Sequence, residues 1–263
     1  MIGKVFLVGA GPGDPELLTV KALHILQRAD VVLHDSLVSE EVLGLISSKA
    51  ELVDVGKRAG FKLLTQDEIN SLLVAYAVKY GVVVRLKGGD PLLFGRASEE
   101  IEGLRNANIP YEIVPGISAA FGAAATAGIS LTDRRAASQV LFTTFSRSND
   151  VKSLGWREVT RDTTLAIYMP GTDYSEVATR LMDAGLSSDT PCVVVSHASR
   201  ADQQICWTSV GALFDEQKLP APALIIVGRV ATQEVREIGD KVSAVSVSQP
   251  EFADAIPQNW LKH

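Results

Sequence analysis

The sequence predicts an α/β protein built from two α/β domains with a ligand cleft between them. Up to residue 116, short β-branched runs alternate with helical patterns, which is typical of a parallel sheet covered by helices. A charge-free stretch rich in Ala and Gly follows, and the later strands come in closer succession. With 263 residues, the chain suits two domains, and we expect an N-terminal domain over 1–116, a C-terminal domain over 117–237 and a tail over 238–263.

The first domain opens with a strand, a glycine turn and a helix. Lys4 to Val8 is a β-branched and aromatic run, and Gly9 to Gly13 forms a turn that glycine follows cheaply. A helix is expected to start after Asp14, a good N-cap, with Pro15 at its first position. Four more strands are expected at 31–33, 51–55, 82–86 and 111–114, and a helix with a capping box at Thr65 and Glu68 over 65–79.

The second domain is expected to hold strands at 139–145, 164–169, 192–195, 203–208 and 223–230. The runs at 191–195 and 203–208 leave no room for a full helix between them, so we expect them to be antiparallel. Residues 113–132 carry no charge and approach the ~20 residues that cross a bilayer. Their small side chains gain little from lipid, so they predict a buried, closely packed helix.

Charge and cysteine content narrow the class of protein. The net charge of −6, with 25 Lys and Arg against 31 Asp and Glu, does not favour a nucleic-acid partner. Cys192 and Cys206 are too few for a disulfide scaffold and lack zinc-site spacing, so we expect a reducing compartment and no metal. No basic leader followed by an apolar core is seen at residues 1–6. These features predict a cytoplasmic protein without a membrane partner.

The Gly9–Gly13 loop invites comparison with dinucleotide-binding loops. Its third glycine follows the second by two residues, whereas the dinucleotide fingerprint has three. Asp35, after the second expected strand, would fit a ribose-binding acid, so a nicotinamide-dependent dehydrogenase stays open. A purely structural turn is an equally good interpretation of the loop.

A second glycine pair and a local excess of positive charge point to an anionic ligand. In the segment Arg85–Pro91, Gly88 and Gly89 would let the backbone approach a ligand, and Asp90 could bind that ligand or cap a following helix. Residues 56–96 hold seven basic and three acidic residues in an acidic chain. Arginine suits carboxylate recognition, although scattered solvated charges are the alternative.

Four segments in order give the chain a resemblance to the tetrapyrrole methylase family, and it covers nearly the whole length: Val5–Asp14, Val55–Gly60, Arg85–Pro91 and Pro222–Val230. The resemblance implies the tetrapyrrole methylase fold, a homodimer, and S-adenosylmethionine bound in the cleft. It implies methylation of uroporphyrinogen III at C2 and C7 to precorrin-2, for sirohaem or cobalamin biosynthesis. A related methylase acting on a later corrin precursor and a non-catalytic tetrapyrrole carrier are the alternatives.

The resemblance also assigns residues by motif. It implies that S-adenosylmethionine contacts Pro12, Gly88, Gly89, Asp90, Leu93, Ser118, Ala119, Met169, Ala198 and Ala223. It implies that Asp35 accepts a proton and that Lys57 donates one. Because the implied substrate is a polycarboxylate, we expect basic side chains to contact it or to support groups that do: Arg58, Arg85 and Arg96.

Overall fold

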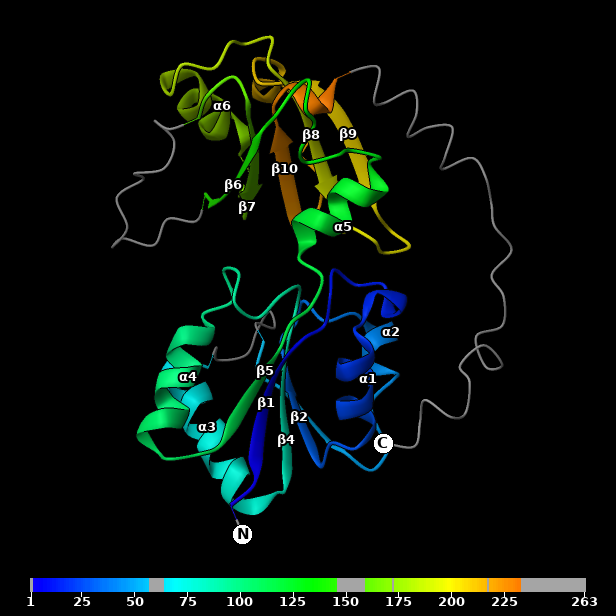
Figure 1. Ribbon diagram of the computed structural model, residues 1–263, viewed down its shortest axis with the longest axis vertical. Helices are drawn as coiled ribbons and strands as arrows, with labels where there is room; N and C mark the ends of the chain where they lie inside the picture. The colour runs from blue at the N-terminus through cyan, green and yellow to red at the C-terminus, as the bar shows by residue number, and fades with distance from the viewer. Residues whose placement is uncertain (1, 57–63, 146–158, 172, 217, 233–263) are drawn as a thin grey trace, which may run out of the picture.

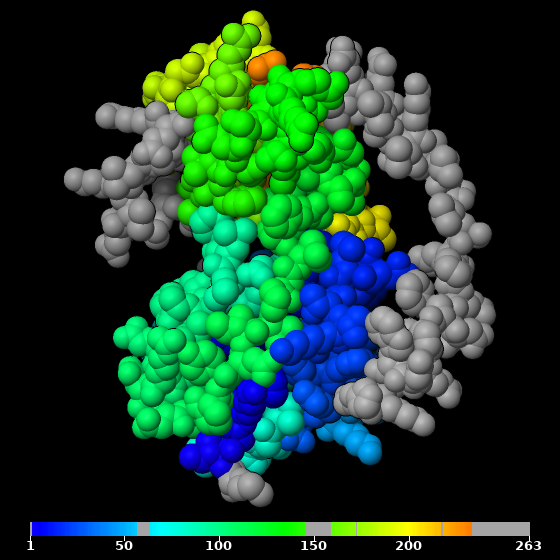
Figure 2. All heavy atoms as spheres, in the orientation of Figure 1, coloured from blue at the N-terminus to red at the C-terminus, as the bar shows by residue number. Residues whose placement is uncertain are grey.

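The computed structural model describes residues 2–56, 64–145, 159–171, 173–216 and 218–232. Two α/β bodies lie one above the other along the long axis, each built on its own five-stranded sheet (Figure 1). The lower body, coloured from blue to green, and the upper body, coloured from green to orange, meet in the middle of the molecule (Figure 2). The predicted fold class is therefore confirmed. The expected tail over 238–263 lies outside the described residues.

The sheet of the first domain is entirely parallel, in the order β3-β2-β4-β1-β5. All five strands point toward the second domain, so the loops that follow them meet at one edge (Figure 1). A sheet covered on both faces needs apolar runs, and the sequence supplies them. The strands are β1 Lys4–Gly9, β2 Val31–His34, β3 Glu51–Asp54, β4 Val82–Lys87 and β5 Tyr111–Val114.

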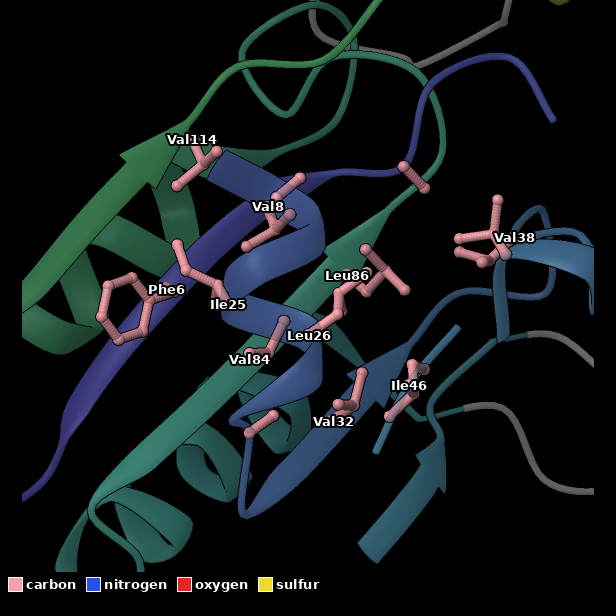
Figure 3. Packing of buried hydrophobic residues seen from close by; sticks show 14 residues of the cluster. Phe6, Val8, Ile25, Leu26, Val32, Val38, Ile46, Val84, Leu86 and Val114 are labelled. Carbon is pink, nitrogen blue, oxygen red and sulfur yellow. The ribbon is translucent and has the colours of Figure 1, made fainter. Parts of the chain in front are cut away.

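Two helices cover each face of this sheet. On one face, α1 (Val20–Gln27) and α2 (Glu40–Leu43) bury side chains that include Phe6, Ile25 and Leu86 (Figure 3). On the other face lie α3 (Gln66–Lys79) and α4 (Ala97–Asn106). The predicted capping box of α3 is confirmed, since the Thr65 hydroxyl accepts from Glu68 N–H and the Glu68 carboxylate accepts from Thr65 N–H.

The first helix differs from the prediction. Asp14 caps a single 3₁₀ turn at Pro15–Leu17, after which Leu18 and Thr19 adopt extended backbone. The Thr19 hydroxyl then accepts from Ala22 N–H and starts α1 at Val20. Two good caps lie in one short segment, and the second one begins the helix.

The second sheet is mixed, in the order β6-β7-β10-β8-β9. Only β6 and β7 pair in parallel, and the predicted antiparallel pairing of β8 with β9 is confirmed. The strands are β6 Gln139–Thr144, β7 Thr163–Tyr168, β8 Pro191–Ser196, β9 Gln204–Ser209 and β10 Ala223–Val227. Short 3₁₀ helices follow β9 and β10, at Ala212–Phe214 and Arg229–Ala231.

In the described part of the second domain, α5 (Ala119–Thr126) packs on one face of the sheet and α6 (Tyr174–Asp183) on the other. The small residues Ala120, Gly122 and Ala123 bury α5 closely, as the sequence predicts. Across the described ranges, no helix combines the length and apolar character needed to cross a bilayer.

Candidate active site

A cavity of about 470 Å³ lies between the two domains, at the edge where the strands of the first sheet end. All ten residues expected to contact the cofactor line this cavity, and so do Asp35, Arg85 and Arg96. Lys57 and Arg58 lie outside the described residues. The motifs therefore converge on one place in the fold, although they are spread over more than two hundred positions of the chain.

Three glycines bring separate backbone segments into close contact beside the cavity, because none of them carries a side chain. We call Gly9, Gly89 and Gly116 the glycine crossing, since a Cβ on Gly116 would lie 2.4 Å from Gly89 O and 2.8 Å from Gly9 Cα. Gly11 and Gly89 exchange backbone hydrogen bonds of 3.2 and 2.7 Å, and both have positive φ. A Cβ on Gly89 would approach only Ala119 N, at 3.7 Å. The cavity wall here is main chain, which fits the close approach of a flat ligand.

The Asp90 side chain links the loop after β4 to the loop after β5. Its carboxylate accepts from Leu92 N–H at 2.8 Å and from Gly116 N–H at 3.1 Å. The alternative role as a cap of a helix starting at Pro91 is wrong, since α4 begins at Ala97. Residues 91–96 instead form turns along the cavity rim.

A charged cluster of Asp35, Arg85, Lys87 and Glu100 lies at another wall, and every member except Glu100 lines the cavity. Arg85 Nη2 lies 2.5 Å from Asp35 Oδ1 and Arg85 Nε lies 2.9 Å from Glu100 Oε1, while Lys87 Nζ lies 2.9 Å from the same Glu100 oxygen. The Arg85 and Lys87 side chains are 3% and 4% exposed, against 27% for Asp35. Two cations thus face two carboxylates, and Asp35 is the member most open to the cavity.

The surroundings shift the pKa values of both cations. Burial, followed by the positive charge of Arg85, lowers the pKa of the Lys87 ammonium, against the opposing effect of the carboxylates. Burial also disfavours the charge on Arg85, but Asp35 and Glu100 outweigh it and raise the pKa of the guanidinium. Arg85 already pairs with both carboxylates, so its guanidinium is placed to support Asp35 more than to bind substrate directly.

Arg96 has a different setting. It lies at the exposed rim in a left-handed backbone conformation and forms two hydrogen bonds of 2.7 Å with the Glu99 carboxylate. The Glu99 contact raises the pKa of Arg96 and the same contact lowers the pKa of Glu99. An exposed guanidinium at the cavity mouth is accessible to an anionic group of a ligand.

The second domain contributes an aromatic wall. The Tyr168 hydroxyl bonds to the Ser118 hydroxyl and accepts from Ala120 N–H at 3.1 Å, which fixes the start of α5 against β7. Burial raises the pKa of Tyr168. Its ring centroid lies 5.0 Å from that of Phe94, so an aromatic contact joins the two domains at the cavity.

Backbone strain gathers around the same cavity. Six residues other than glycine have positive φ in the described part of the chain, and Asn108 lies away from the site. The remaining ones line the cavity or flank Ala198, which lines it: Phe94, Arg96, Met169, His197 and Ser199. Such conformations are costly and cluster at functional sites.

Several residues of the site carry no role in the sequence interpretation, among them Glu100, Tyr168 and Arg200. Glu100 had a signal, because it lies on the buried stripe of α4 between Ala97 and Leu104. An acid on an apolar stripe needs a partner. The roles of Tyr168 and Arg200 depend on contacts between distant segments, which no local pattern shows.

Comparison with known proteins was decisive for the family. A family model described as Tetrapyrrole (Corrin/Porphyrin) Methylases matches residues 4–213. The chain belongs to the tetrapyrrole methylase family. Its strand order also differs from the 3-2-1-4-5 order of dinucleotide-binding domains, which disfavours a dehydrogenase.

Solved tetrapyrrole methylases resemble the structure closely. Uroporphyrin III C-methyl transferase from Thermus thermophilus superimposes with a TM-score of 0.76 at 36% identity, covering 87% of this chain and 98% of that chain. The same enzyme has been solved in complex with S-adenyl homocysteine, with the same agreement. A cobalt precorrin-4 methyltransferase also gives 0.76, at 32% identity, over 87% of this chain and 96% of that chain.

Curated relatives include longer proteins. Siroheme synthase 1 of Yersinia enterocolitica is 46% identical over 230 residues, which is 87% of this chain and 49% of the relative. Siroheme synthase of Actinobacillus pleuropneumoniae is 47% identical over 232 residues, covering 88% and 48%. The chain spans about half the length of the curated relatives it matches.

Proposed function

We propose that this chain transfers methyl groups from S-adenosylmethionine to C2 and C7 of uroporphyrinogen III, giving precorrin-2. The observation that carries the proposal is that ten motif residues and the Asp35 carboxylate line one cavity between the domains. The similarity to a uroporphyrin III C-methyl transferase over nearly its full length supports the substrate class.

The cavity has the features that the cofactor needs. The main-chain wall at Gly11 and Gly89 and the small side chains of Ala119 and Ala198 leave room for a flat adenosyl group. The neighbour solved with S-adenyl homocysteine supports this choice of ligand. Once bound, S-adenosylmethionine would supply the methyl group by an in-line displacement, so the contribution of the chain is mainly positioning in a closed cleft.

Asp35 is our candidate for the proton acceptor. A pyrrole carbon that gains a methyl cation makes the macrocycle cationic, so a proton must leave it. The Asp35 carboxylate faces the cavity and is held from behind by Arg85. Lys57 is proposed as the proton donor, and Arg58 and Arg96 as contacts for substrate carboxylates. We further expect a cytoplasmic homodimer, which size-exclusion chromatography with light scattering tests for oligomeric state.

A methylase of a later corrin precursor is the second candidate, because a cobalt precorrin-4 methyltransferase is about as similar in structure. The test is anaerobic incubation with uroporphyrinogen III and S-adenosylmethionine, followed by mass spectrometry. We expect a monomethylated intermediate and then a dimethylated product.

Methylation of a later corrin intermediate alone would favour the second candidate. Binding of labelled S-adenosylmethionine separates the remaining classes, because a dehydrogenase would not bind it and a carrier would bind only the macrocycle.

A further inference from the structure

Glu100 is the most buried member of the charged cluster. Its side chain is 0% exposed. Oε1 accepts from Arg85 Nε and Lys87 Nζ and, at 3.5 Å, from Gln66 Nε2, whereas Oε2 has no hydrogen-bond partner among the described residues. A buried ion cluster is not an efficient stabiliser, since well-packed apolar side chains of similar volume often stabilise as well or better. Stability alone therefore does not account for this cluster.

Arg85 connects Glu100 to the cavity. Its Nη1 donates to the carbonyls of Leu33 and Leu86 at 3.4 and 3.2 Å, its Nε donates to Glu100, and its Nη2 donates to Asp35. The guanidinium is planar and rigid, so fixing Nε at Glu100 fixes the direction in which Nη2 points. The contact that reaches the cavity is the one with Asp35.

The positive charge of Lys87 explains why the hydrogen-bond acceptor at position 100 has to be negatively charged. Arg85 and Lys87 lie two residues apart on β4, and both side chains are almost fully buried. Without the charge of Glu100, Asp35 would be the one carboxylate of this four-residue cluster left to balance two buried cations. The Lys87 ammonium would then repel Arg85 and compete with it for Asp35, because buried charges require a partner.

We propose that Glu100 is a positioning residue: by balancing Arg85 and Lys87, it holds the Asp35 carboxylate at the cavity wall in the orientation used for proton transfer. This inference rests on the proposed function, because it concerns the proton acceptor of methyl transfer. Glu100 itself does not reach the cavity.

The test is a double-mutant cycle on the full chain, with initial-rate kinetics and calorimetric binding of S-adenosylhomocysteine. Glu100→Gln keeps an acceptor for Arg85 but removes the charge, so we expect kcat to fall by about tenfold or more, with KM and the Kd of the analogue changed less than about threefold. Glu100→Gln/Lys87→Met removes one charge of each sign. Its kcat should return to within about fivefold of wild type, because the two sites are coupled. Glu102→Gln, exposed on the same helix, is the matched control.

Three results would overturn the inference. They are wild-type kcat in Glu100→Gln, a double variant as slow as the single one, and loss of analogue binding in parallel with kcat, which would indicate general damage. If Glu100→Gln does not fold, Lys87→Met takes its place, and its kcat should lie below that of the double variant. Failure of the proposed function looks different, since wild type itself would then add no methyl group to uroporphyrinogen III.

Discussion

Arg200 of the second domain packs directly against Gly13 of the first. A Cβ on Gly13 would lie 2.5 Å from Arg200 Cγ and 2.7 Å from Arg200 Nε, and the Arg200 guanidinium donates to the carbonyl of Leu37. The missing side chain at position 13 lets Arg200 pass from one domain to the other beside the cavity that it lines. The loop between β8 and β9 is thereby tied to the loop after β1.

This contact predicts a steric effect that a second substitution relieves. Gly13→Ala should destabilise the protein by about 1–3 kcal/mol through overlap with Arg200, in addition to the strain of an alanine at φ +145°. Gly13→Ala/Arg200→Ala should recover the steric part and keep the strain. Urea unfolding of both single variants and the double variant measures the coupling, and strictly additive effects would contradict the contact.

Asp90 predicts a loss of cofactor affinity. Asp90→Ala removes the acceptor for both Leu92 N–H and Gly116 N–H, so the loops beside the glycine crossing lose their link. We expect the Kd for S-adenosylhomocysteine to rise by about tenfold to a hundredfold, equivalent to about 1.5–3 kcal/mol. Calorimetry measures it, and Asp90→Asn, which keeps an oxygen acceptor, should be affected less. Unchanged affinity in folded Asp90→Ala would remove the residue from the binding site.

Asp35 predicts a loss of turnover without a loss of cofactor. Asp35→Asn keeps the shape and removes the negative charge, and the residues proposed to bind the cofactor lie on other loops. We expect kcat to fall by roughly 10²–10⁴-fold, with a smaller change in KM. Steady-state kinetics and analogue binding measure both. A raised KM at unchanged kcat would make Asp35 a substrate-binding residue, and wild-type kinetics would exclude it from the site.

The ion pairs of Glu112, a residue that does not line the cavity, predict that the stability of the fold depends on pH. Hydrogen bonds from Lys21 and Lys4 hold the pKa of the β5 residue Glu112 at about 2, below its ordinary 4.5. A carboxylate with a lowered pKa stabilises the fold above about pH 4.5, and this stabilisation is lost as the pH falls through about 2.

Glu112→Gln should therefore lower the free energy of unfolding at pH 7. The effect should be on the order of 1 kcal/mol or less, because solvent screens a partly exposed pair. The difference in free energy of unfolding between Glu112→Gln and wild type should shrink as the pH falls from 4.5 to 2. Urea titrations at several pH values measure it, with Glu102→Gln as control. A difference that does not vary with pH would show that the ion pairs contribute nothing.

The strands and the cavity were predictable because their signals are local. Runs such as Val31–Leu33 and Val82–Val84 are apolar on both faces, and such runs form the interior of a parallel sheet. The glycines of the loop after β1 and of Gly88-Gly89 mark places where the backbone has positive φ or passes close to another segment. The family resemblance adds the positions in the second domain, which lack a pattern of their own.

The parts that were not predictable depend on contacts across the fold. The start of α1 is decided by competition between the caps Asp14 and Thr19, which have similar side-chain chemistry. The pairing of Arg85 with Glu100 joins a strand to the helix that packs on it, and although Glu100 lies on an apolar stripe, no local pattern identifies Arg85 as its partner. Strand order places their partner Asp35 beside them, and no short segment encodes that order.

The glycine crossing has a consequence for redesign of the enzyme. A Cβ on Gly9 or Gly116 would collide with backbone atoms, and a side chain on Gly89 would be strained at φ +67°, so none of these three positions readily accepts a new recognition group. New substrate preferences have to come from the rim, where the exposed side chains of Phe94 and Arg96 line the cavity. A variant library confined to these two rim positions would keep the residues proposed to bind the cofactor constant and explore only the acceptor molecule.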